Sequence, residues 1–391
     1  MNARRLLFLA MAATTLPWAV HPPPGHASGL PESAPWGRVE REEIFLEAPT
    51  ERVALVPLPA SRTVWRFPGR RLEEVTSFFD DSVNRPELLR AMQSQIALQE
   101  LPRETRAFPQ AELLRALPPL NRRLIYRELA RFDANPFHRQ PVFLDSDDVA
   151  AWYARSSLPP GFLTRIETMI YPVGSSWAFS DFPSLLRQTE TEAEETALRQ
   201  AMTRARSFLL TLHIGARDDR SALLAYWSLG DFAELSRPLR ETLAFEEGTE
   251  TSVDLTHLLP PLPRRLLHTF PSARDGLEGE YPDAFWTSAN FFEPEPDPSF
   301  RDREAAIAHI TATRRRVEPP WLFGDVIFLR DPGPEGRPVH ACVYLADDLV
   351  FTKNRRSPLV PWVVMDLDHV AARFSLLSAP VREGWRITPV P

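Results

Sequence analysis

Prolines are spread along the whole chain and limit the length of any regular element. The sequence has 40 prolines among 391 residues, about twice the average usage of roughly 5%. Because the proline ring fixes φ and removes a backbone donor, proline is disfavoured in helix interiors and in central strands. The sequence therefore predicts many short helices and strands with stiff connections between them.

The first 27 residues have the layout of an export signal. Arg4 and Arg5 precede the apolar run "LLFLAMAATTLPWAV", and small residues end the segment at Ala27. This layout is typical of a signal peptide, and the apolar run is too short for a comfortable membrane span. No cysteine follows it for lipid attachment. We therefore expect an exported bacterial protein, periplasmic or secreted, with no stable membrane anchor after cleavage.

Charge and cysteine content exclude several classes of protein. The formal net charge is −7, whereas nucleic-acid-binding surfaces and segments that dock on anionic lipid are basic. We therefore expect no nucleic-acid partner. The only cysteine is Cys342, so no internal disulfide can form and the fold must depend on its hydrophobic core.

Most of the chain before residue 270 has a helical pattern. Residues 28–60 form a short lead segment with two β-like runs, and 61–270 contain segments such as "PELLRAMQSQIALQEL", with apolar residues three and four apart. The segment 192–215 has acids first, arginines later and a terminal Gly215, which is the polarity of a capped helix. We therefore expect a helical N-terminal domain, whose role the sequence does not define.

The periodicity changes near residue 320. The runs "GDVIFLRD", "HACVYLADD", "LVFTKN" and "WVVMDLD" are short and rich in β-branched and aromatic residues, and turn residues bound them. "LADDLV" has the form of a tight hairpin. The chain is therefore predicted to be α+β, with a helical N-terminal domain followed by an antiparallel-sheet domain at 271–391.

The C-terminal strands carry a series of short motifs in a fixed order. Gly324-Asp325 opens one hydrophobic strand and His340 opens the next. A small residue and an aliphatic-Tyr-Leu run follow at 342–345, and an acidic turn follows at 347–348. The order and spacing resemble the NlpC/P60 family of papain-like cell-wall cysteine peptidases and amidases. The resemblance covers only 271–391 and implies a papain-like fold there, with His340 as the catalytic base.

The same resemblance points to the place of the nucleophile. The segment "GEYPDAFWTSANFF" resembles the helix opening that carries the cysteine in this family, once Pro282 and "NFF" are matched. A helix N-terminus lowers the pKa of a thiol. The matched position is Ala284, which carries no nucleophile. The resemblance therefore implies a degenerate active site from which the nucleophile has been lost.

Two other residues are weaker candidates for the nucleophile. Cys342 and His340 lie two apart on one predicted strand, which separates their Cα atoms by about 6.5–7 Å. A nucleophile and its base approach to roughly 3 Å, so Cys342 fits better as a small, buried side chain. Ser288, like Thr287 beside it, lies one turn into the predicted helix. Serine needs strong activation by a base, and Ser288 is expected to pack against the sheet.

His340 is the one residue of the implied site that is present. A polar residue on the next strand would orient the base, and the resemblance puts that position at Thr352, with Lys353 and Asn354 as adjacent alternatives. A threonine hydroxyl makes a weaker hydrogen bond than a carboxylate. His340 is equally compatible with a half-buried histidine that serves packing or with a residue that contacts a ligand.

No motif for a metal or a cofactor stands out. The spacing of His257 and His268 fits no common zinc motif. "DSDD" at 146–149 lacks the glycine and the bidentate glutamate of an EF-hand loop, and it is typical of a helix cap. We therefore expect neither a metal nor another cofactor.

Three hypotheses about function remain open at this stage. The first is an exported, catalytically degenerate NlpC/P60-like protein that binds a peptidoglycan stem peptide, or another exported protein, in the old active cleft. The second is an active amidase or endopeptidase of cysteine or serine type with a displaced nucleophile. The third is a non-enzymatic helical scaffold. Ala284 and the intact His340 strand favour the first.

Overall fold

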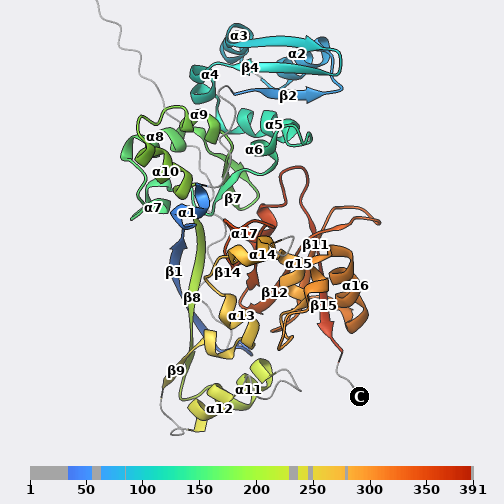
Figure 1. The fold of residues 1–391 in the computed structure, drawn as a ribbon. Helices are drawn as coiled ribbons and strands as arrows, with labels where there is room; N and C mark the ends of the chain where they lie inside the picture. The colour runs from blue at the N-terminus through green and yellow to red at the C-terminus, as the bar shows by residue number, and fades with distance from the viewer. Residues whose placement is uncertain are drawn as a thin grey trace, which may run out of the picture.

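A computed structural model gives the fold of residues 34–54, 63–83, 85–228, 237–244, 250–277 and 281–388 (Figure 1). The chain is an α+β protein in which helices and antiparallel strands alternate along the described residues. The elements are short, and the longest helices of the described part, α5 (Pro119–Leu129) and α16 (Arg303–Thr313), have 11 residues each. The expected signal peptide at 1–27 lies outside the described residues.

The N-terminal body, residues 63–202, holds two three-stranded antiparallel sheets in the orders β2-β4-β3 and β5-β7-β6. The strands are β2 (Trp65–Pro68), β3 (Ile96–Leu101), β4 (Glu104–Pro109), β5 (Val142–Leu144), β6 (Tyr171–Val173) and β7 (Ser176–Phe179). Besides α5, the helices are α2 (Leu72–Asp81), α3 (Pro86–Gln95), α4 (Ala111–Ala116), α6 (Pro136–Arg139), α7 (Val149–Trp152), α8 (Pro160–Met169), α9 (Phe182–Leu186) and α10 (Glu192–Ala201). The short helix α1 (Thr50–Val53) precedes this body.

The expectation of a helical domain at 61–270 therefore missed its strands. The clearest case is "PELLRAMQSQIALQEL", which was expected to be one helix. The helix α3 ends at Gln95, and Ile96 begins β3, which pairs with β4 from Ile96↔Pro109 to Leu101↔Glu104. The helical spacing runs on into a strand because pairing across a sheet overrides local propensity.

The segment 192–215, also expected to be one helix, folds as a helix followed by a strand. After α10, the strand β8 (Ala205–Ile214) runs antiparallel to the whole of β1 (Arg38–Leu46). Its second half has buried residues at alternate positions, the period of a strand; these are Phe208, Leu210, Leu212 and Ile214. The order of charges, with acids first and arginines later, correctly indicates a helix only in the first half of the segment.

The C-terminal sheet has six antiparallel strands in the order β10-β15-β11-β12-β13-β14. They are β10 (Arg314–Val317), β11 (Val326–Arg330), β12 (Pro338–Ala346), β13 (Leu349–Thr352), β14 (Val363–Asp366) and β15 (Val381–Ile387). The helix α15 (Ala284–Ala289) packs on one face, where Phe285 meets Phe328. The helix α17 (Leu367–Ala372) packs on the other face, in the same apolar cluster as Cys342 and Tyr344.

The apolar residues described between 205 and 277 pack with the C-terminal sheet. Leu210 and Trp227 share an apolar cluster with Val343 of β12, whereas the apolar residues of the N-terminal body form a cluster of their own. The division between the two bodies therefore lies near residue 204 and not at 270, because β8 buries its apolar side against the C-terminal core. The remaining elements are β9 (Thr251–Asp254), α11 (Arg220–Ser228), α12 (Arg237–Ala244), α13 (Pro261–Leu266), α14 (Ala273–Leu277), η1 (Leu255–Leu258) and η2 (Pro298–Arg301).

The strand β8 also caps the edge of the C-terminal sheet at β14. The hydroxyl of Ser207 accepts a hydrogen bond from the Val364 amide at 2.9 Å and donates one to the Val364 carbonyl at 3.2 Å. Nε2 of His268 lies 2.9 Å from the same hydroxyl. An edge strand otherwise leaves such backbone groups unpaired, so one serine satisfies them without a further strand.

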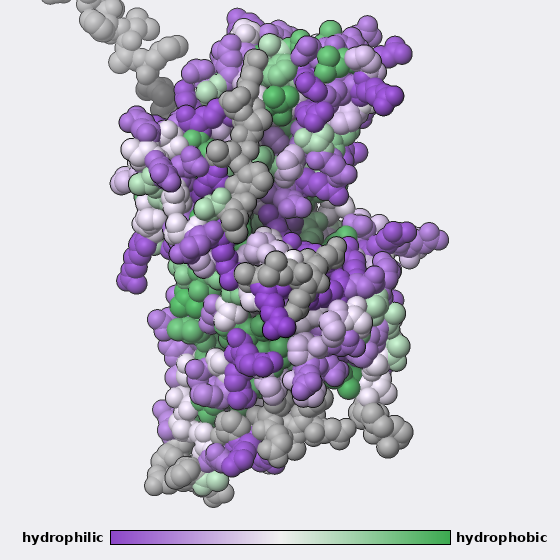
Figure 2. All heavy atoms as spheres, viewed as in Figure 1, coloured by the Kyte–Doolittle hydropathy of each residue, from purple (hydrophilic) through white to green (hydrophobic). Residues whose placement is uncertain are grey.

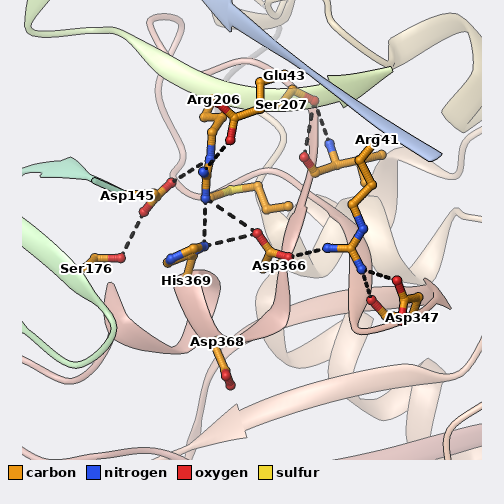
Figure 3. A network of polar contacts seen from close by, with 12 residues as sticks. Arg41, Glu43, Asp145, Ser176, Arg206, Ser207, Asp347, Asp366, Asp368 and His369 are labelled. Carbon is orange, nitrogen blue, oxygen red and sulfur yellow. Dashed lines mark hydrogen bonds and ion pairs between the residues drawn. The ribbon is translucent and has the colours of Figure 1, made fainter. Parts of the chain in front are cut away.

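A network of charged side chains lies where β1 and β8 meet the C-terminal sheet, and it extends to Asp145 of the N-terminal body (Figure 3). Arg41 of β1 and Arg206 of β8 approach Asp366, at the end of β14, at 2.7 and 3.5 Å. Asp145, which follows β5, accepts two hydrogen bonds from Arg373, which follows α17, at 2.8 and 2.9 Å. Burial opposes ionisation of Asp145, but Arg373 and Arg206 lower its pKa overall. The carboxylate therefore stays charged at the junction.

The surface seen in Figure 2 is mostly hydrophilic, and apolar side chains gather on it along β1 and β8. Leu209 of β8 is 43% exposed. No helix in the described part of the chain combines the length and the apolar character needed to cross a bilayer.

Candidate functional site

A cleft of about 830 Å³ lies where the N-terminal body meets the C-terminal sheet. Three groups of segments line it: 139–143 and 202–205 on the N-terminal side; 283–285 and 301–303 at the starts of α15 and α16; and 339–340, 353–357, 359–361 and 373–374 around the sheet and α17. The N-terminal region, whose role the sequence left undefined, therefore supplies one wall of the cleft.

Ala284 is the first residue of α15 and lines this cleft. Asp283 caps the helix, because its Oδ1 atom accepts hydrogen bonds from the amides of Phe285 and Trp286 at 2.9 and 3.0 Å. Its Oδ2 atom accepts a hydrogen bond from Arg356 at 2.8 Å. Burial raises the pKa of Asp283. Both oxygens of Asp283 are thus engaged in holding the start of the helix.

His340 lies on β12 and lines the same cleft. Its Nε2 atom is 2.9 Å from the hydroxyl oxygen of Thr352 on β13, and its ring stacks on Phe374 with centroids 4.5 Å apart. Burial, together with the positive charges of Arg303 and Arg373, lowers the pKa of His340 to about 3. A general base works best with a pKa near the working pH, so this imidazole is a weak base.

Neither weaker candidate for the nucleophile lines the cleft. Cys342 is fully buried on the α17 side of the sheet, where its Sγ atom lies 3.7 Å from the Ile327 carbonyl and burial raises its pKa to about 12. Ser288 is fully buried in α15, and its hydroxyl has no partner among the described residues. The hydroxyl of Thr287 donates to the Asp283 carbonyl at 2.7 Å and accepts from Trp362 at 2.9 Å.

Lys353, the only lysine of the chain, is a buried member of the cleft lining. Its amine donates hydrogen bonds to the carbonyls of Arg355 and Ser357 at 2.5 and 2.9 Å, and it lies 5.6 Å from the ring centroid of Trp362. Burial lowers the pKa of Lys353 to about 7, although the charges of Asp283 and Asp275 oppose this shift. The sequence had offered Lys353 only as an alternative to Thr352.

Two arginines of the lining, Arg303 and Arg355, form no ion pair with a carboxylate of the described residues. The guanidinium of Arg303 lies 4.6 Å from the ring centroid of Phe285. Arg355 donates to the Pro141 carbonyl at 2.8 Å, and burial lowers its pKa to about 10. Within the described residues, no carboxylate forms an ion pair with Arg303, Arg355 or Lys353.

Other arginines of the lining are neutralised by acids. Arg373 pairs with Asp145 at 2.8 Å, and Arg204 pairs with Glu47 at 2.6 Å. In both cases the carboxylate lies outside the lining. These pairs build the walls of the cleft, so the charge that remains available inside it comes from other residues.

The described residues hold no group of three or more histidines, cysteines, aspartates or glutamates placed like metal ligands. His268 contacts Ser207, as described above. In the "DSDD" segment, Asp148 accepts a hydrogen bond from the Ala151 amide at 2.9 Å and caps α7, which is the role that the sequence predicts.

Comparison of the chain with family models, with curated proteins and with solved structures finds no match.

Of the residues singled out from the sequence, Ala284 and His340 line one cleft, and Thr352 contacts His340 beside it. Asp283 and Arg303 were not singled out from the sequence. An aspartate directly before a predicted helix is a recognisable cap signal. An arginine at a helix start, in contrast, has the pattern of ordinary solvated charge.

Proposed function

We propose that the chain is an exported, catalytically degenerate protein with an NlpC/P60-like, papain-like C-terminal domain, which binds a peptidoglycan stem peptide in its cleft without cleaving it. One observation carries the proposal. Ala284 opens a helix that packs against an antiparallel sheet, and it lines the same cleft as His340. In the resembling family, a cysteine and a histidine occupy these two positions.

The chemistry of the cleft supports binding without hydrolysis. Ala284 offers no nucleophile, and the only thiol of the chain is buried on the other side of the sheet. The pKa of His340, about 3, leaves its imidazole neutral and weakly basic at neutral pH. Loss of a nucleophile alone typically costs on the order of 10⁶ in kcat. An active enzyme with a displaced nucleophile is therefore the less favoured alternative.

The size and lining of the cleft support a short peptide as ligand. Ligand sites typically enclose about 300–1,000 Å³ and combine apolar walls with a few polar groups. The volume of about 830 Å³ lies in this range. Phe143, Phe285 and Phe374 provide apolar surface within the lining. A folded protein partner would need a broader surface, so the stem peptide is the favoured ligand.

Binding and turnover are measured together to test the proposal. The mature chain is titrated with a disaccharide–tetrapeptide fragment of peptidoglycan by calorimetry, and the mixture is then analysed by mass spectrometry. We expect saturable binding and no cleaved fragment. Ala284→Trp fills the cleft and abolishes binding, whereas the control Ala308→Trp, on an exposed position of α16, preserves it.

Two outcomes would overturn the proposal in different ways. Fragments that form with the wild type and disappear with His340→Ala would show an active amidase or endopeptidase. Absence of binding in the folded wild type would favour the scaffold hypothesis. Circular dichroism of each variant excludes unfolding as the cause of lost binding.

A further inference from the structure

We infer that the cleft selects acidic peptides, and that Arg303, Lys353 and Arg355 receive the carboxylates of the ligand. This inference rests on the proposed function, because it assigns the chemistry of the ligand to the same cleft. It goes beyond that function by naming three recognition residues. Arg303 and Arg355 lie outside the resembling motifs, and Lys353 directly follows Thr352.

The lining of the cleft is strongly basic, although the chain as a whole is acidic. Seven arginines and one lysine line it, against two aspartates, Asp283 and Asp302. The formal net charge of the chain is −7. Acids outside the lining neutralise residues such as Arg373 and Arg204. Within the described residues, the positive charge that no carboxylate pairs with lies on Arg303, Lys353 and Arg355.

Two of the three cations, Arg303 and Lys353, act on residues at the start of α15, and Arg355 lines the same cleft beside Pro141. Arg303 lies against Phe285, and its charge affects the pKa of both Asp283 and His340. The charges of Lys353 and Asp283 likewise influence each other. Arg303 begins α16, whereas Lys353 and Arg355 follow β13. Two separate elements therefore direct positive charge toward the position of the missing nucleophile.

Desolvation without a carboxylate ion pair among the described residues makes Lys353 and Arg355 good anion receptors. Burial lowers the pKa of Lys353 to about 7 and that of Arg355 to about 10, which means that their charged forms are poorly stabilised in the empty cleft. A carboxylate supplies the missing charge and accepts hydrogen bonds from them. Arginine is especially suited to this role, since its planar guanidinium can bind a carboxylate through two parallel hydrogen bonds.

The opposite wall fits the uncharged part of such a ligand. Val142 and Phe143 of β5, together with Met202, line the N-terminal side of the cleft. The guanidinium of Arg373, which follows α17, lies 5.4 Å from the ring centroid of Phe143 and so contacts this wall. A peptide with aliphatic side chains on one side and carboxylates on the other matches this arrangement.

A matched pair of ligands tests the inference. The wild type is titrated with a disaccharide–tetrapeptide that has free carboxylates and with the same compound after amidation of every carboxylate. We expect the acidic form to bind about 10-fold tighter or better at 0.1 M salt, the scale of one or two charge-assisted hydrogen bonds. The difference shrinks at 1 M salt, where screening acts over about 3 Å.

Variants assign the effect to residues. Arg303→Gln is the primary variant, because its side chain is exposed and makes no ion pair within the described part of the chain. We expect it to weaken binding of the acidic peptide about 10-fold and to leave the amidated peptide unchanged. Arg355→Gln is expected to act in the same direction. Arg315→Gln, an exposed arginine on β10 outside the lining, is the control and keeps wild-type affinity.

The results separate this inference from the proposed function. If both peptides bind the wild type equally, or if Arg303→Gln weakens both equally, carboxylate selection is wrong and peptide binding stands. If neither peptide binds the folded wild type, the proposed function fails as well. Lys353→Met provides a third variant of the proposed recognition residues, and its melting temperature shows whether it is folded before its affinity is used.

Discussion

The hydroxyl oxygen of Thr352 lies 2.9 Å from Nε2 of His340, so one nitrogen of the imidazole is engaged by the neighbouring strand. Phe374 stacks on the same ring with centroids 4.5 Å apart. The ring is therefore held in a fixed orientation beside the cleft. Its pKa, about 3 through burial, makes it a poor base.

Restoring a thiol at the start of α15 should not restore hydrolysis. We predict that Ala284→Cys shows a turnover below about one-thousandth of that of an ordinary peptidase, because acid–base catalysis contributes about 10²–10⁴ and the low pKa of His340 removes it. The measurement is peptide turnover by mass spectrometry, in a Cys342→Ala background. In this background the introduced thiol is the only one, so iodoacetamide labelling shows whether it is accessible. Turnover of 1 s⁻¹ or more, the ordinary range for enzymes, would refute a degenerate site.

Stability should fall at mildly acidic pH because of two buried histidines. Burial lowers the pKa of His138 and of His340 to about 3, whereas the unfolded value is near 6.5. The folded state therefore binds fewer protons than the unfolded state, and stability that is complete above pH 6.5 is lost as the pH falls toward 3. Each histidine should cost about 2 kcal/mol between pH 6.5 and 5.

His138→Phe checks this contribution. His138 stacks edge-on against Tyr126 with centroids 4.6 Å apart, and its Nε2 atom has no partner among the described residues, so the substitution keeps the packing. In urea unfolding at pH 7 and pH 5, the variant should lose about 2 kcal/mol less than the wild type on acidification. An equal loss in both proteins would show that His138 does not titrate in this way.

The junction between the two bodies should depend on Asp145. We predict that Asp145→Asn lowers the free energy of unfolding by about 3–5 kcal/mol, because it leaves Arg373 buried without its charge partner. The matched control is Asp133→Asn, which removes an exposed ion pair with Arg139 and should cost under about 1 kcal/mol. Comparable losses in the two variants, measured by urea unfolding, would argue against a junction held by Asp145.

The edge of the C-terminal sheet should depend on Ser207. Ser207→Ala removes both hydrogen bonds to the backbone of Val364, and unsatisfied buried backbone groups should cost about 1–3 kcal/mol. Hydrogen exchange should also show faster exchange of the Val364 amide. Ser252→Ala on β9, where the side chain is exposed, serves as control. Unchanged protection of Val364 would mean that β14 does not need this contact.

The C-terminal strands could be predicted from the sequence, because their apolar runs are bounded by clear turn residues. The strand β12 begins close to His340, and β13 ends at Thr352, as the motif order indicates. The strand β8 was missed because only residues 202–204 separate its alternating pattern from the end of helix α10. A pattern spanning two elements blurs both periods.

The candidate site was only partly predictable, since its walls come from distant segments. Ala284 and His340 were found through a resemblance in one part of the chain. Phe143 and Met202 reach the cleft through the packing of the two bodies, and the Asp145–Arg373 pair holds that packing. Such long-range contacts leave no local periodicity in the sequence. Arg303 was missed for the same reason.

Binding without cleavage is tested most directly by equilibrium dialysis of the mature chain against a disaccharide–tetrapeptide, with mass spectrometry of the ligand recovered from both chambers. We predict that the ligand accumulates with the protein, saturates at one molecule per chain and is recovered intact. Recovery of a cleaved peptide, or equal ligand in both chambers with a folded protein, would contradict this prediction.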